Sequence, residues 1–175
     1  MLDLPYPLRA AVVALVTATC LLVVTLSPDP AFPARVHELV VLLGHLAALA
    51  LGFGAVLAVD WHGLLWLLRR IELPELLTVT SRLSTPVWLG LTGLVATGAL
   101  LSPDADSSLT RLKLVLVTLV TVNGLHAEAV HQALERASSS AEPLPLRLLL
   151  RGLAVGAISQ VGWWGATVIG LMNTT

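Results

Sequence analysis

The chain has 175 residues, of which 56% are apolar and 12% are charged, and its mean hydropathy is +0.86. A soluble domain carries about 25% charged residues, and a small one exposes too much surface to hide so many apolar side chains. The net charge of −1 and the single cysteine also exclude a nucleic-acid partner and an intrachain disulfide. The composition therefore predicts an all-α integral membrane protein in contact with the lipid bilayer.

Five apolar stretches are long enough to cross the ~30 Å hydrocarbon layer, which takes about 20 helical residues. In chain order they cover residues 8–26, 36–59, 84–101, 111–130 and 149–172. No clear small-residue cleavage site follows the first stretch, so we expect an uncleaved span there. The third span is expected to begin at Thr85-Pro86, because proline fits the first turn of a helix. We interpret the five spans as one bundle that makes a single transmembrane domain over residues 1–175.

Two further features concern the ends of the spans. Residues 62–73 mix Trp, Leu and Arg, which predicts an interfacial helix along the headgroups. Alternate loops carry seven basic residues on one side and three on the other. The larger group is Arg9, Arg69, Arg70, Arg82, Arg136, Arg147 and Arg151, and the smaller is Arg35, Arg111 and Lys113. The positive-inside rule then places the amino terminus in the cytoplasm and the carboxyl terminus outside, in a membrane of the bacterial cytoplasmic type.

Polar side chains inside a membrane are costly, so we expect any chemistry to depend on them. With a rise of 1.5 Å per residue, His45 lies about 5 Å to the outer side of the midplane and His126 about 7 Å to the inner side. This difference in depth disfavours the pair as two ligands of one haem. Better candidates lie on the outer half of the membrane with His45, namely Cys20 on the first span and Lys113 or His37 nearer the rim. Imidazole is a frequent ligand of haem iron, zinc and copper. The alternative is that His45 makes an interhelical hydrogen bond to a threonine or a carbonyl group.

Small residues recur at intervals of four in the last span. They are Gly152 and Gly156, followed by Gly162, Ala166 and Gly170. Such spacing lets helix backbones approach closely, either within the chain or against a membrane partner or a second copy. The pattern predicts tight helix packing and indicates no chemistry.

The second to fourth spans resemble the HemJ-type and CopD-like membrane proteins. The resemblance covers about residues 37–127 and depends on a Gly44-His45 run rich in glycine and alanine, on Thr85-Pro86 followed by Ala96-Thr97-Gly98, and on Leu112-Lys113-Leu114. It implies binding of haem b or copper, with His45 as the important histidine, His37 as the competing match and Lys113 as the important lysine. The chain lacks the Trp and Arg that follow the first histidine in HemJ-type proteins and has an extra span at each end. The resemblance thus implies haem or metal binding more directly than protoporphyrinogen oxidation.

Three functional hypotheses follow from these patterns. The first is a haem-b protein with a redox or electron-transfer role, in which His45 is the axial ligand and Lys113 or His126 is the second ligand or a propionate or proton partner. The second is a non-catalytic membrane subunit or assembly factor, and the third is a transporter of small solutes or metals. Phosphate-binding loops, nucleophile elbows and zinc-protease motifs are missing from the sequence. Whether the chain is an enzyme therefore stays open.

Overall fold

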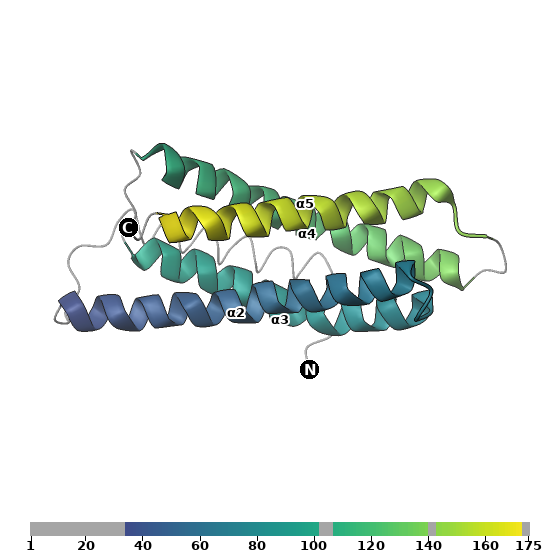
Figure 1. Cartoon of the computed structure of the whole chain (residues 1–175), viewed down its shortest axis with the longest axis horizontal. Coiled ribbons are helices and arrows are strands. Elements are labelled where there is room, and N and C mark those ends of the chain that lie inside the picture. The colour runs from purple at the N-terminus through teal and green to yellow at the C-terminus, as the bar shows by residue number, and fades with distance from the viewer. Residues whose placement is uncertain (1–33, 102–106, 140–142, 173–175) are drawn as a thin grey trace. The chain divides into compact units, whose positions relative to one another are not determined.

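The computed structural model describes residues 34–101, 107–139 and 143–172 of the chain. These residues form four helices (Figure 1), and no strand occurs among them. The helices are α2 (Ala34–Leu67), α3 (Leu73–Leu100), α4 (Ser108–Ser138) and α5 (Leu146–Met172). The predicted first span, residues 8–26, lies outside the described residues. The five-span count and the sides of the two termini therefore stay predictions.

All four helices are long and apolar enough to cross a membrane. They contain 27 to 34 residues, which corresponds to about 40–51 Å along the helix axis. Large apolar side chains point outward from them, and Val40, Val115 and Val161 are 62–65% exposed. Water penalises such exposure, whereas lipid tails do not. The described helices are those of a multi-pass membrane protein, as the composition predicts.

The third predicted span is wrong at its start. Helix α3 begins at Leu73, so Pro86 lies in the interior of a 28-residue helix and not in its first turn. Proline has no N–H and cannot donate to the carbonyl oxygen of Arg82, four residues earlier. Membrane helices tolerate such a position because surrounding groups re-satisfy the freed carbonyl. Residues 78–85, six of which are polar, are helical as well, and a span estimated from apolar length alone does not include them.

The predicted interfacial helix over residues 62–73 is also wrong. Residues 62–67 are the end of α2, and a turn at residues 68–72 leads into α3. The N–H of Arg70 donates to the carbonyl of Leu65 at 2.8 Å, and that of Arg69 donates to Trp66 at 2.9 Å. These two bonds form the Schellman motif that ends many helices. Arg69 takes its left-handed position with φ 56°, where glycine is the usual residue.

Arg69→Gly is expected to raise the free energy of unfolding by about 1 kcal/mol, because glycine adopts the left-handed conformation without the clash of a Cβ atom. Unfolding by SDS in mixed micelles measures the change. The neighbouring Arg70 is the matched control, since it also loses a charge on replacement by glycine but has no positive φ. Equal effects of the two substitutions would show that backbone strain at Arg69 is not what is relieved.

The described residues fall into two compact units. The first contains residues 34–57 of α2 and residues 83–101, which include the carboxyl-terminal part of α3. The second contains residues 58–82 and the whole of α4 and α5. The boundary crosses α3 between Arg82 and Leu83, at the turn that Pro86 weakens. The single transmembrane domain stays a prediction, and each unit is described by itself below.

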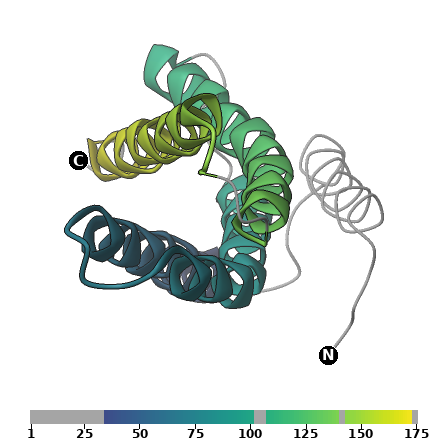
Figure 2. The ribbon, with the colours of Figure 1, turned by 90° about the vertical axis from the view of Figure 1, so that its right-hand side faces the viewer.

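In the second unit, α4 and α5 pack side by side (Figure 2). Gly162 is buried under Val120, where a Cβ atom would overlap the valine side chain. Near the middle of both helices, the buried Asn123 donates from Nδ2 to the carbonyl of Val155 at 2.9 Å. Gly162 thus serves packing within the chain, whereas Gly156 has nothing within 4 Å of the position of a Cβ atom. A membrane partner or second copy at the glycine-rich face stays a prediction.

Candidate functional site: His45 between two helices

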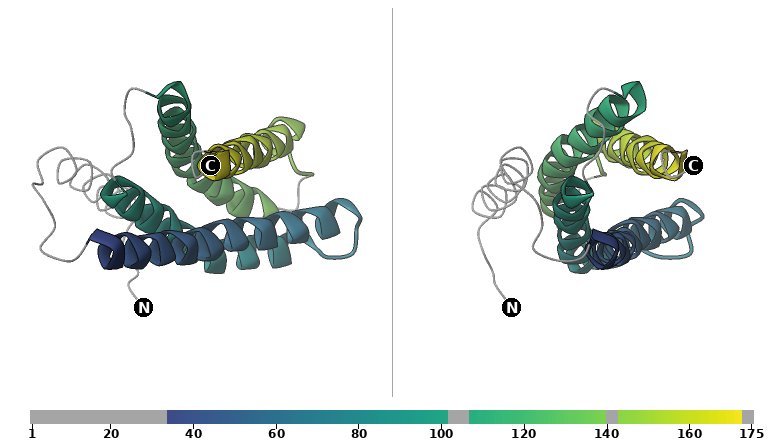
Figure 3. Two further views of the ribbon diagram at one scale, coloured as in Figure 1. Left: turned by 60° about the vertical axis from the view of Figure 1, so that its left-hand side comes forward. Right: turned by 90° about the vertical axis from the view of Figure 1, so that its left-hand side faces the viewer.

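In the first unit, small residues line the facing sides of α2 and α3, which run side by side (Figure 3). The facing pairs are Gly44 with Thr97, Ala48 with Gly93, and Gly52 with Gly90. A Cβ atom at position 90 would overlap the Cα and N atoms of Gly52 and would lie 2.7 Å from the carbonyl oxygen of Ala48. The two backbones therefore approach each other as closely as small residues permit.

This close approach brings the His45 side chain against α3. His45 is half-buried, and its Nδ1 lies 2.8 Å from Oγ1 of Thr97. A Cβ atom at Gly98 would lie 3.2 Å from Cε1 of His45, so the glycine leaves room for the imidazole ring. The interhelical hydrogen bond from His45 to a threonine, one of the two sequence interpretations, is therefore confirmed.

The hydroxyl of Thr97 identifies the tautomer of His45. Thr97 donates its only hydroxyl proton to the carbonyl of Gly93 at 2.6 Å. Its oxygen must then accept the second bond, so the proton of the neutral imidazole is on Nδ1 of His45. The lone pair is left on Nε2, which is the arrangement of histidines that bind a metal through one nitrogen and are oriented through the other.

Lys113 and His126 both belong to α4 in the second unit, while His45 belongs to the first. The Nζ atom of Lys113 lies beside Gly170, where a Cβ atom would be 3.4 Å away. Gly170 is in the last turn of α5, whose unbonded carbonyl groups attract a cation. The ammonium group of Lys113 therefore lies near the carboxyl end of α5. Its predicted role beside a haem is untested.

His126 is exposed on α4, thirteen residues after Lys113. The corresponding distance along the helix axis is about 20 Å. Two axial ligands of one iron are much closer than this, so Lys113 and His126 are alternatives for a second ligand and not joint partners. The side chain of His37 lies outside the described part of the structure.

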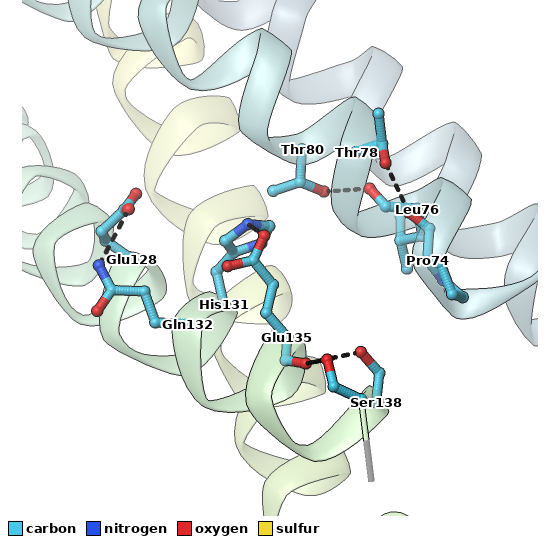
Figure 4. A network of polar contacts seen from close by, with 10 residues as sticks. Pro74, Leu76, Thr78, Thr80, Glu128, His131, Gln132, Glu135 and Ser138 are labelled. Carbon is cyan, nitrogen blue, oxygen red and sulfur yellow. Dashed lines mark hydrogen bonds and ion pairs between the residues drawn. The ribbon is translucent and has the colours of Figure 1, made fainter. Parts of the chain in front are cut away.

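A polar cluster in the second unit involves the first turns of α3 and the last turns of α4 (Figure 4). His131 is buried, with its Nε2 3.2 Å from Oε1 of Glu135. On α3, Thr80 donates to the carbonyl of Leu76 at 2.9 Å. Each contact joins residues one turn apart on the same helix. The cluster fixes local turns, and among the described residues no three His, Cys, Asp or Glu side chains gather as a metal site.

The sequence contained a signal for this site beyond the histidine itself. Gly44, Ala48 and Gly52 recur at intervals of four around His45, as the glycines of α5 do. This spacing in α2 predicts a packing face as directly as the equivalent spacing in α5 does. Thr97 and Gly98 contribute to the family resemblance, but their contact with His45 depends on the register between two helices.

Comparison with protein-family models, curated proteins and solved structures finds no match to this chain.

Proposed function

We propose that the protein binds haem b through Nε2 of His45 and has a redox or electron-transfer role in the membrane. The observation that supports this proposal is the hydrogen bond between His45 and Thr97, which orients the imidazole at the contact between α2 and α3. The resemblance to HemJ-type and CopD-like proteins belongs to the same proposal. We also propose that the chain has five spans and a cytoplasmic amino terminus and that it lies in a bacterial cytoplasmic membrane.

Haem b fits these residues because the porphyrin supplies four ligands of the iron, so that one or two protein side chains complete the coordination. When bound, haem supplies one-electron chemistry. In this proposal the residues of the chain have three tasks. His45 is the ligand, Thr97 holds its ring, and the small residues at Gly52 and Gly90 keep α2 close to α3.

Haemin titration of the purified, detergent-solubilised protein tests the proposal. His45→Ala is expected to abolish stoichiometric binding and its Soret absorption, because the axial nitrogen is lost. His62→Ala is a matched control on the same helix, since His62 donates from Nδ1 to the carbonyl of Ala58 one turn earlier. The control variant is expected to bind haemin like the wild-type protein. Unchanged binding by His45→Ala would contradict the proposal.

A non-catalytic membrane subunit is the alternative, and the close contact of α2 with α3 also suits it. His45 and Thr97 would then act only as a polar link between helices, which is a common use of such residues in membranes. In that case the wild-type protein would be folded but would not bind haemin. The same titration therefore separates the two functions.

A further inference from the structure

An acidic side chain in the second unit is bonded to the middle of a membrane helix. Asp60 of α2 accepts a hydrogen bond at Oδ2 from Nε2 of Gln160 on α5. Gln160 lies fourteen residues after Leu146 and twelve before Met172, the two ends of α5. These separations correspond to about 21 Å and 18 Å along the helix. Asp60 itself lies about 14 Å from the middle of α2 along the helix axis, whereas Gln160 lies about 2 Å from the middle of α5. The hydrocarbon layer extends about 15 Å to either side of its middle, so with each helix centred in the layer both counts place the Asp60 carboxyl within it.

The orientation of the Gln160 amide is determined by a third residue. The indole N–H of Trp164 donates to Oε1 of Gln160 at 2.8 Å. An indole nitrogen can only donate, so the amide oxygen of Gln160 must face Trp164 and its NH₂ group must face Asp60. Oδ2 of Asp60 therefore accepts a hydrogen bond, and a proton that binds to Asp60 would be carried on Oδ1.

No cation compensates Asp60 within the part of the chain that the structure describes. The charged residues of α5 are Arg147 and Arg151, at least nine residues before Gln160 and thus about 13 Å or more along the helix. On α4, which packs against α5, Lys113 lies beside Gly170, about 15 Å beyond Gln160 along α5.

The histidines of the second unit are His62, His126 and His131. His62 of α2 donates from Nδ1 to the carbonyl of Ala58. On α4, His126 is exposed and His131 contacts Glu135. A carboxylate in hydrocarbon without a cation is costly, whereas the neutral acid is tolerated.

We propose that Asp60 is a proton-binding site inside the membrane, held on α5 by Gln160. The carboxylate takes up one proton from the aqueous phase to give the neutral acid and returns the same proton when it ionises. Ionisable residues within membrane spans commonly belong to such proton or ion pathways. The site belongs to the second unit and does not depend on haem binding at His45.

Dicyclohexylcarbodiimide tests this proposal on the full-length protein in phospholipid vesicles. This apolar reagent adds to a neutral carboxylic acid without a leaving group and, after rearrangement, leaves an N-acylurea that peptide mass spectrometry locates. Asp60 is expected to be labelled at neutral pH and to lose labelling at alkaline pH. A water-soluble carbodiimide is expected to label the exposed Glu75 and Glu135 but not Asp60.

Two outcomes would overturn the proposal. One is an Asp60 that the apolar reagent leaves unlabelled from acidic to neutral pH. The other is an Asp60 that the water-soluble reagent labels in parallel with Glu135, since the carboxyl would then face water.

Gln160→Leu tests the role of the amide. Labelling of Asp60 at alkaline pH is expected to increase, because the carboxylate loses its hydrogen-bond donor. An unchanged pH profile would show that Gln160 does not hold the carboxyl. The wild-type measurement needs no variant, so it stands even if Gln160→Leu fails to fold.

Discussion

Gly90→Ala is expected to destabilise the protein more than the addition of one methyl group at any other position of α3. The added Cβ atom would overlap the backbone of Gly52 and approach the carbonyl oxygen of Ala48. Backbone atoms cannot rotate away as the end of a side chain can, so α2 and α3 must separate. Overpacking of a well-packed contact costs about 1–3 kcal/mol, and we expect the upper end of this range or more. SDS unfolding in mixed micelles measures the loss.

Gly54→Ala is the matched control for this substitution. Gly54 belongs to the same unit, lies in the interior of α2 and has nothing within 4 Å of the position of a Cβ atom. Alanine is the better helix former, so this variant is expected to be neutral or slightly stabilised. If Gly90→Ala and Gly54→Ala unfold alike, the close approach of the two helices is not a feature of the folded protein.

Thr97→Val is expected to weaken haemin binding by about 10- to 100-fold, the usual effect of removing a group that orients a ligand. Valine has nearly the shape of threonine but cannot accept the Nδ1–H of His45. The imidazole would lose both its orientation and its preference for the tautomer with a lone pair on Nε2. Haemin titration of the purified variant measures the affinity, and the unfolding free energy is measured in parallel to detect a general loss of stability.

Thr97→Ser is the control, because serine keeps the hydroxyl that bonds to both His45 and Gly93. It is expected to retain most of the wild-type affinity. A valine variant that binds haemin as tightly as the serine variant would contradict the orienting role of Thr97, although His45 could still be the ligand.

The fold was predictable where it depends on apolar length. The spans expected over residues 36–59, 111–130 and 149–172 lie inside α2, α4 and α5. Their ends were not predictable in the same way, because residues beyond the hydrocarbon layer continue the helix through their own backbone hydrogen bonds. Pro86 shows the limit clearly, since proline fits both the first turn of a helix and the interior of a membrane helix.

The candidate site was predictable only in part. A histidine in an apolar span is visible in the sequence, and a threonine was one of its two expected partners. The identity of that partner depends on which residues of α2 and α3 face each other. This register follows from the fit of small residues such as Gly52 and Gly90, which no single span reveals. The bond between Asp60 and Gln160 joins residues one hundred positions apart and was missed for the same reason.

The absorption spectrum of the wild-type protein, purified from haem-replete cells, tests the central claim most directly. The account predicts a Soret band and, after reduction, the α-band of haem b, with both lost in His45→Ala. Far-ultraviolet circular dichroism of the same sample reports whether the helices are folded. A fully helical protein that is colourless and remains so after addition of haemin would contradict the claim that His45 is a haem ligand.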